Sequence, residues 1–190
     1  MGKVIYYLNV SLDGFIEDAN GSLDWGTLDD ELLGFFSEQE RQFDVQLYGR
    51  RIYENMNAHW STAHTHPSAT PRVIEYARVW QSIPKIVFSK TLEQVGENAR
   101  LVRDNITEEV QALKAQDDKN MLVCCAGLAK SFMQLDLIDE YCPLIHPILL
   151  GGGKPMFQTL DTKINLQLIE TRRFDGGAVL LRYQRVHSSI

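Results

Sequence analysis

Gly49, Arg50 and Arg51 stand where an apolar, strand-like segment gives way to a helical one. A glycine in that position leaves the backbone N–H groups of the first helical turn directed at one point, and such a point binds anions. Arginine adds charge-assisted, frequently bidentate hydrogen bonds to phosphate. Ser89 and Lys90, at the end of another apolar segment, would supply a hydroxyl and a third cation. These five residues predict a phosphate site, although an isolated basic pair is also typical of a solvated surface.

Gly151, Gly152 and Gly153 follow a long apolar segment and precede Lys154. Consecutive glycines supply positive-φ backbone, which lets the main chain approach a ligand closely. The same triplet also suits a plain turn, so it is a candidate element of a binding cleft and not a site by itself.

Cys124, Cys125 and Cys142 all lie in apolar segments. Three cysteines do not make a disulfide framework, and two adjacent ones lack the spacer that separates zinc ligands. His64-Thr65-His66 lies in a loop with Thr and Pro, where solvated side chains are the simpler interpretation. We therefore predict buried thiols and no metal site.

The composition argues against several classes of protein. The 190 residues suit one domain, 1–190, and hydrophobic and charged fractions of 44% and 23% are ordinary for a globular protein. A net charge of −6 argues against nucleic-acid binding, which needs clustered Lys and Arg. No apolar run approaches the roughly 20 residues that span a bilayer, and the N-terminal segment lacks the layout of a signal peptide. We expect a cytoplasmic protein whose partner is a small molecule and neither nucleic acid nor membrane.

The apolar residues alternate between strand-like and helical patterns. They recur on one helical face between 28 and 43, after acidic residues that suit a first turn. Further helices are expected from 49 through 56, from 71 to before 84, from a Thr107 cap onward, and from 126 to 135. Strands are expected at 3–10, 44–48, 85–89, 99–102, 121–125, 140–150, 165–173 and 178–186, with a tight turn at Asp175-Gly176-Gly177. This order predicts an α/β fold with a mixed sheet and helices on both faces.

Several blocks of sequence occur in the order found in one family. They are Ser11-Leu12-Asp13-Gly14-Phe15-Ile16, Leu47-Tyr48-Gly49-Arg50-Arg51-Ile52-Tyr53-Glu54, Val87-Phe88-Ser89-Lys90, Ile138-Asp139-Glu140, and Leu150-Gly151-Gly152-Gly153-Lys154-Pro155-Met156-Phe157. Together they resemble the dihydrofolate-reductase-like family, in its riboflavin-biosynthesis-reductase branch, as a stand-alone domain. The resemblance implies a three-layer fold, a mainly parallel sheet of about eight strands with an antiparallel C-terminal edge, and a cleft where cofactor and substrate meet.

In that family the turn that matches Gly49-Arg50-Arg51 meets the phosphates of NADPH, and three cations favour NADPH over NADH. A second turn, which the family builds from two glycines often joined by a cis peptide, aligns with Cys124-Cys125. A cis bond between such residues costs roughly 3–4 kcal/mol, so a remodelled turn, a displaced cofactor and weaker binding are the alternatives. The resemblance implies that the cofactor also contacts a set of small or apolar residues: Ala126, Gly127, Leu128, Gly151 and Gly152.

The resemblance also implies a carboxylate that binds the substrate. In dihydrofolate reductases one acid at the start of the first long helix orients the pterin, and counting from Trp25 places that acid at Asp30. The helix dipole also favours acids there, which is the structural alternative. Asp13 is the second catalytic candidate, although it equally fits an Asx turn leading into Gly14. We expect Asp13 to shape the loop on the nicotinamide side rather than to act as an acid.

The resemblance thus implies an NADPH-dependent reductase that transfers a hydride to a pterin- or pyrimidine-like heterocycle. A small-ligand-binding protein of the same fold, with weak or lost turnover, is the alternative that Cys124-Cys125 favours. The segment 141–150 carries more apolar surface than an edge strand can expose, and the branch commonly pairs through this region. We therefore expect a two-fold homodimer.

Overall fold

The computed structural model describes residues 2–26, 28–116, 118–161 and 163–186. It shows the expected α/β fold, with an eight-stranded, mainly parallel mixed sheet that is antiparallel at its C-terminal edge. The chain divides into two compact units, which are described separately below. Unit 1 is Met1–Lys3 with Leu28–Cys125, and unit 2 is Val4–Thr27 with Ala126–Ile190.

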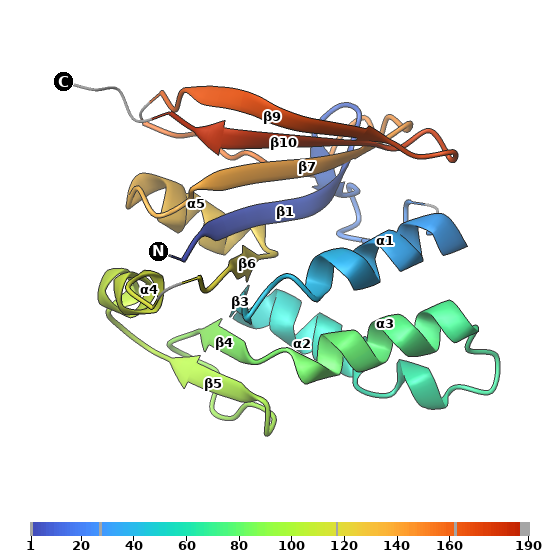
Figure 1. Cartoon of the computed structure of the whole chain (residues 1–190), viewed down its shortest axis with the longest axis horizontal. Helices are drawn as coiled ribbons and strands as arrows, with labels where there is room; N and C mark the ends of the chain where they lie inside the picture. Colours follow the sequence, from blue (N-terminus) through green and yellow to red (C-terminus); the bar gives the residue numbers. More distant parts are fainter. Residues whose placement is uncertain (1, 27, 117, 162, 187–190) are drawn as a thin grey trace. The chain divides into compact units, whose positions relative to one another are not determined.

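Unit 1 contains four parallel strands in the order β5 (Ala99–Val102), β4 (Lys85–Phe88), β3 (Val45–Gly49) and β6 (Met121–Val123). Its helices are α1 (Asp30–Glu40), α2 (Arg50–Trp60), α3 (Pro71–Ser82) and α4 (Ile106–Lys114), with a 3-10 turn at Ala63–Thr65. Figure 1 shows α1, α2 and α3 grouped together and α4 apart from them. No helix within the described ranges is long and apolar enough to cross a membrane.

Two helices of unit 1, α1 and α3, begin after residues whose side chains accept from free N–H groups. Asp29 caps α1, since its Oδ1 accepts from the Leu32 N–H at 2.8 Å, and Thr70 caps α3 just before Pro71. The expected Thr107 cap is wrong. α4 begins at Ile106 after its N-cap Asn105, two residues earlier than expected, and the Asn105 φ of 61° is a left-handed conformation that asparagine tolerates.

Unit 2 contains strands in the order β1 (Val4–Ser11), β7 (Glu140–His146), β10 (Val179–Arg185) and β9 (Leu166–Arg173), together with α5 (Ala126–Gln134). β1 and β7 are parallel, whereas β10 is antiparallel to both of its neighbours. The tight turn expected before β10 is confirmed, with the Gly177 N–H donating to the Phe174 carbonyl at 3.0 Å. A second small sheet pairs β2 (Phe15–Glu17) with β8 (Lys154–Pro155), and these strands are too short to show an alternating apolar pattern in the sequence.

Strand β7 is central within unit 2, not an edge. It pairs with β1 on one side and β10 on the other, and it ends at His146 rather than at residue 150. Tyr141 is 2% exposed and Leu144 is fully buried. The apolar character of β7 therefore comes mostly from burial in the core of unit 2, and β7 is not the exposed edge that the sequence suggested, whereas the expected homodimer stays a prediction.

A buried polar cluster lies inside unit 1 among α1, α3, β3 and β4. Glu40 accepts hydrogen bonds from Gln46 Nε2 at 2.5 Å and from the Tyr76 hydroxyl at 3.3 Å. Lys85 donates to the Trp80 carbonyl at 2.5 Å, and its Nζ lies 4.0 Å from the centroid of the Trp80 ring. Burial raises the pKa of Glu40 to about 7, although the Gln46 and Tyr76 hydrogen bonds and the Lys85 charge oppose that shift. Burial likewise lowers the pKa of Lys85 to about 8.

This cluster should make the stability of the fold depend on pH. The folded-state pKa of Glu40 lies above its ordinary value of 4.5, so its stabilising contribution is complete below that value and is lost as pH rises through about 7. Lys85 has the opposite pH dependence. Its folded-state pKa lies below the ordinary value, so its contribution to the free energy of unfolding is present at high pH and is lost as pH falls through about 8.

The variant Glu40→Gln keeps the shape of the side chain and removes its charge. We expect the wild type to lose on the order of 2–3 kcal/mol of unfolding free energy relative to this variant between about pH 5 and pH 8. Urea denaturation of both proteins across that range measures it, and parallel pH profiles would contradict the assignment.

Candidate functional site

The N-terminus of α2 carries the features of an anion site. Gly49 ends β3 and serves as the N-cap residue of α2, with an extended backbone at φ −87° and ψ 161°, and no side chain among the described residues caps the helix there. Arg50 and Arg51 are its first two residues, both exposed, and no acid lies in this first turn. The helix dipole favours negative charge at that end, so two arginines there oppose helix stability. Arg50 Nε lies 3.5 Å from Glu54 Oε2 one turn along the helix, and an exposed ion pair of this kind contributes little, so an anion could take the place of Glu54.

The loop after β4 lies beside this helix start. β4 is parallel to β3, with Phe88 opposite Gly49, so the residues that follow both strands emerge at the same edge. Arg50 Nη1 donates to Thr91 Oγ1 at 3.1 Å, and the Thr91 N–H donates to Ser89 Oγ at 3.2 Å. The structure therefore links Arg50 to Ser89 through Thr91, a residue that the sequence reasoning missed.

Lys90 lies in the same loop but points to solvent. Its side chain is 81% exposed, and its Nζ lies 3.6 Å from Asp104 Oδ1. Arg103, which the sequence reasoning did not single out, donates to the Lys90 carbonyl at 3.2 Å. An exposed ion pair of this kind contributes about 0–1 kcal/mol, so an anion could displace Asp104 at little cost.

The Cys124-Cys125 turn packs against the same helix start. No peptide bond between described residues is cis, so this turn differs from the cis form that the resemblance implied. The Gly49 N–H donates to Cys125 Sγ at 3.2 Å, and a Cβ on Gly49 would lie 3.6 Å from that sulfur. Cys124 packs beside Tyr48 and Tyr53. The turn is therefore remodelled, and the Cys125 sulfur takes one of the N–H groups that could otherwise face an anion.

The thiols should react slowly in the folded protein. Cys125 and Cys142 are buried and Cys124 is half-buried. Burial raises the pKa of Cys124 well above its ordinary value and that of Cys142 to about 12, which suppresses the reactive thiolate. We expect Ellman's reagent to modify fewer than one thiol per chain on the time scale in which the urea-unfolded protein reacts fully. Rapid modification of two or more thiols without urea would contradict this burial.

In unit 2, the first turn of α5 holds three residues of the predicted cofactor set. Ala126 and Leu128 are buried, whereas Gly127 is exposed, with nothing within 4 Å of the place where a Cβ would lie. Gly127 thus leaves open space on the surface of this turn, which a ligand could approach.

Asp13 joins two loops of unit 2. It accepts hydrogen bonds from Ser11 Oγ at 2.6 Å, from the Leu150 N–H at 3.1 Å and from the Gly151 N–H at 2.7 Å. These bonds, led by that from Ser11, lower the pKa of Asp13. A carboxylate held in its ionised form suits a structural role in positioning the loop better than the role of a proton donor.

The glycine triplet is shaped by the neighbouring strand. Gly151 and Gly153 have φ values of 73° and 135°, and a Cβ on Gly153 would lie 1.9 Å from the Glu17 carbonyl oxygen. Only glycine fits that position. Gly152 has open space around it.

Asp30 is the first residue of α1 in unit 1, and its side chain is exposed. The neighbouring Asp29, not Asp30, makes the capping hydrogen bond. Asp30 is thus free of the capping role that explains its neighbour, which leaves it available for the predicted contact with a substrate.

His146 is a further candidate to which the sequence reasoning gave no role. It ends β7 opposite Ser11, the last residue of the parallel strand β1, and it is 4% exposed. Its Nε2 lies 3.0 Å from Asn9 Oδ1, and its ring meets Trp25 edge-on with centroids 5.5 Å apart. The carboxyl ends of parallel strands are where α/β folds bind ligands. The signal in the sequence was a histidine at the end of an apolar strand, but its partner Asn9 is 137 residues away.

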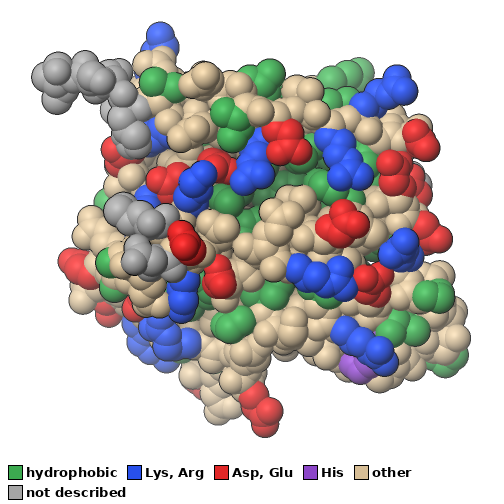
Figure 2. Space-filling model, viewed as in Figure 1, with side chains coloured by type: hydrophobic (Ala, Val, Ile, Leu, Met, Phe, Trp, Pro, Cys, Tyr) green, Lys and Arg blue, Asp and Glu red, His purple; other side chains and the backbone are tan. Residues whose placement is uncertain are grey.

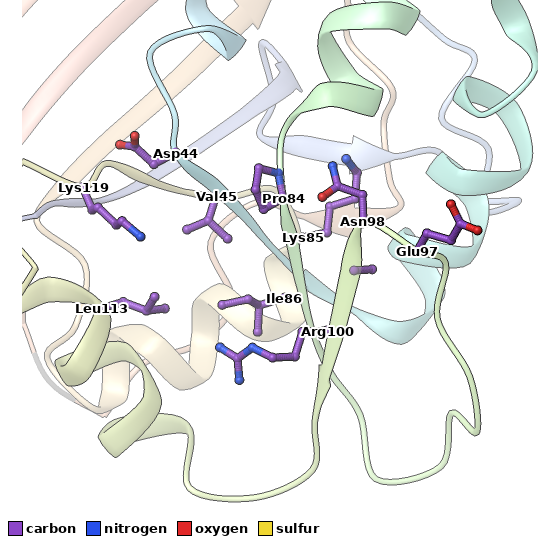
Figure 3. A pocket seen from close by; sticks show the side chains of 11 residues that line it. Asp44, Val45, Pro84, Lys85, Ile86, Glu97, Asn98, Arg100, Leu113 and Lys119 are labelled. Carbon is purple, nitrogen blue, oxygen red and sulfur yellow. The ribbon is translucent and has the colours of Figure 1, made fainter.

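A separate hollow of about 320 Å³ opens at the amino ends of the unit 1 strands (Figure 3). Val45 and Ile86 line it together with charges of both signs, such as Asp44 and Lys119. It lies at the start of β3, whereas the anion candidate lies at the end of the same strand. The hollow is therefore not part of that site.

Comparisons with known proteins agree with this architecture. A structure described as a putative riboflavin biosynthesis protein from Shewanella sp. PV-4 aligns with a TM-score of 0.77 and 23% identity, over 97% of this chain and 99% of that one. Dihydrofolate reductase from Enterococcus faecalis, complexed with NADP(H) and RAB-propyl, aligns with a TM-score of 0.63 and 16% identity, over 96% of each chain. At these identities the likeness shows the fold alone.

Sequence comparison extends the relationship over the whole chain. The uncharacterized protein YyaP of Bacillus subtilis (strain 168) is 36% identical over 182 residues, which cover 95% of this chain and 94% of that protein. The model of the RibD C-terminal domain family matches residues 2–180. The chain therefore belongs to the RibD C-terminal domain family.

Proposed function

We propose that this chain is a cytoplasmic, single-domain reductase that uses NADPH to reduce a C=N or C=O bond of a flat, pterin- or pyrimidine-like heterocycle. The observation that carries the proposal is the start of α2, where two arginines occupy a helix end that favours negative charge. Family membership supports it, since the structural relatives include a reductase complexed with NADP(H). We also propose that the protein acts as a homodimer.

The residues of unit 1 fit a phosphorylated dinucleotide. Gly49 leaves the first turn of α2 without a side-chain cap, and Arg50 and Arg51 lie in that turn. Ser89 and Lys90 follow β4, the strand parallel to β3. An additional phosphate on the ribose would be bound by these cations, which is the physical basis for preferring NADPH over NADH. Once bound, NADPH supplies the hydride, while the protein supplies alignment and a proton.

In unit 2 the predicted contacts with the same cofactor come from backbone. Ala126, Gly127 and Leu128 present the first turn of α5, and Gly151 and Gly152 present a turn that Asp13 holds in place. Residues without bulky exposed side chains allow close approach of the main chain. This part of the proposal rests on the resemblance together with the open space beside Gly127 and Gly152.

A proton must reach the heteroatom when a hydride adds to a C=N or C=O bond. We propose that His146 supplies it: the imidazolium gives its proton to the substrate nitrogen or oxygen, becomes neutral and is protonated again from water. The Nε2 atom lies within hydrogen-bonding distance of Asn9 Oδ1, at 3.0 Å, and this contact fixes the orientation of the ring. Asp30 remains the proposed substrate-orienting carboxylate, and Asp13 the proposed loop-positioning residue.

One observation favours the alternative of a ligand-binding protein with weak turnover. The N–H of Gly49 donates to Cys125 Sγ and not to open space, so the helix start offers one donor fewer to a phosphate. In this alternative the protein has the same fold and binds the heterocycle but does not reduce it.

An NADPH titration followed by addition of substrate separates the two. The reductase proposal expects the NADPH fluorescence signal to saturate, and NADPH absorbance to fall when dihydrofolate or a ribosylated aminopyrimidine is added. Binding of a heterocycle without any response to NADPH would support the alternative instead.

A further inference from the structure

Two basic side chains of the proposed phosphate site are each paired with an acid of unit 1. Arg50 Nε lies 3.5 Å from Glu54 Oε2, one turn along α2. Lys90 Nζ lies 3.6 Å from Asp104 Oδ1, in the loop between β5 and α4. An anion that binds either cation must therefore take the place of a carboxylate of the same chain.

Both pairs are weak contributors to the fold. The four side chains are between 48% and 81% exposed, and exposed ion pairs contribute little to stability. On a helix, arginine followed by glutamate one turn later also gains less than the reverse order. Removing either acid should therefore leave the fold intact, whereas it directly changes what an incoming anion meets.

The loop that carries Lys90 is fixed against the loop that carries Asp104. Arg103 Nη1 donates to the Lys90 carbonyl at 3.2 Å, and the Ser89 N–H donates to the Val102 carbonyl at 3.0 Å. These contacts continue the pairing of β4 with β5, which Figure 1 shows side by side. The fold thus presents the Asp104 carboxylate to Lys90 at a high local concentration, with which an anion in solution must compete.

The charge of the whole chain works in the same direction. The chain carries 25 acidic and 19 basic residues, and Figure 2 shows acidic side chains beside basic ones over much of the face that it draws. The net charge therefore repels an anion, and the cations of a phosphate site must outweigh the acids beside them. Acids that pair with those cations lower the affinity for phosphate, and their removal should raise it.

We propose that Glu54 and Asp104 limit how strongly this protein binds the ribose phosphate that distinguishes NADPH from NADH. Each carboxylate pairs with a cation that the phosphate would otherwise bind, and the phosphate must displace it. The two acids therefore determine the degree of preference for NADPH, because NADH carries no group that competes with them. The inference rests on the NADPH site proposed above and adds the residues that act against binding there.

Neutral variants of the two acids test this in the direction of stronger binding. Glu54→Gln and Asp104→Asn should each lower the NADPH dissociation constant about threefold, the scale of an exposed ion pair, and the double variant about tenfold. The NADH dissociation constant should not change. A damaged fold weakens the binding of both cofactors, so a gain confined to NADPH excludes that explanation. Fluorescence titration at low ionic strength gives the constants, and the gain should largely disappear at about 1 M salt, where the screening length is about 3 Å.

Three further variants separate pairing from the general effect of charge. Glu75→Gln removes a surface acid that pairs with Arg41 and Arg72, away from the site, and should leave both dissociation constants unchanged. Glu54→Asp keeps the charge but shortens the side chain, so it should strengthen NADPH binding part of the way. In an Arg50→Ala background, Glu54→Gln should have no effect, because the arginine through which Glu54 acts is absent.

Two ligands without a nicotinamide keep this test apart from the reaction. In calorimetry, adenosine 2′,5′-bisphosphate should respond to the acid variants as NADPH does, and 5′-AMP should not respond. Wild-type protein that binds neither NADPH nor the bisphosphate would overturn the proposed cofactor and this inference together. Binding that Arg50→Ala weakens but that neither acid variant strengthens would overturn this inference alone, and so would equal gains for NADPH and NADH.

Discussion

Replacing His146 by glutamine should lower kcat/KM for substrate reduction by about 10²-fold or more, the usual scale for loss of a positioned acid. Glutamine can still donate to Asn9 Oδ1, so the local packing changes little, but it carries no proton to give. The dissociation constant of NADPH should stay close to that of the wild type, because the phosphates are assigned to residues of unit 1. Stopped-flow measurement of NADPH oxidation gives the rate, and fluorescence titration gives the affinity.

Two companion variants make this result specific to His146. Asp30→Asn tests the carboxylate predicted from the sequence. If it abolishes turnover while His146→Gln does not, the proton route belongs to Asp30. His146→Ala with added imidazole tests the chemistry directly, since partial recovery of the rate by the imidazolium form of the added base requires a proton-donating role for His146. A His146→Gln protein with wild-type turnover would remove His146 from the mechanism.

Arg50→Ala should raise the NADPH dissociation constant about tenfold or more, because a hydrogen bond to a charged group contributes on the order of 1.5–3 kcal/mol. NADH lacks the extra phosphate, so its affinity should fall less. Arg72→Ala is the matched control: Arg72 is an exposed arginine of unit 1 that pairs with Glu75 on the same helix. Equal losses for both cofactors would show that Arg50 does not bind that phosphate.

The sequence was most informative where a local pattern and the fold agree. The helix beginning near Asp30 and the strand ending at Gly49 lie where apolar spacing and turn residues placed them. The predictions failed where residues far away in the sequence determine how a segment is paired or buried. The apolar strand β7 looked like an exposed edge, because its neighbours β1 and β10 are far away in the chain and no local pattern names them.

The candidate site shows the same division. The helix start with Arg50 could be predicted, since a glycine and a basic pair at a strand end are adjacent in sequence. The role of Cys125 could not be predicted, because its sulfur accepts from the N–H of Gly49, 76 residues away. The role of His146 could not be predicted either, because the pairing of β1 with β7 brings Asn9 to it and the segment after β2 brings Trp25. Long-range pairing is a property of the whole fold, and it determines which polar side chains meet.

The reaction proposed for this chain is the transfer of a hydride from NADPH to a heterocycle. Hydride transfer is tested with NADPH that carries deuterium at both C4 positions of the nicotinamide, with dihydrofolate and a ribosylated aminopyrimidine as separate substrates and mass spectrometry of the products. We expect one deuterium per molecule of reduced product, and loss of that label with the His146→Gln variant over the same time. NADPH that binds tightly but transfers no deuterium to either heterocycle would contradict it, and the ligand-binding alternative would then be the better explanation of this fold.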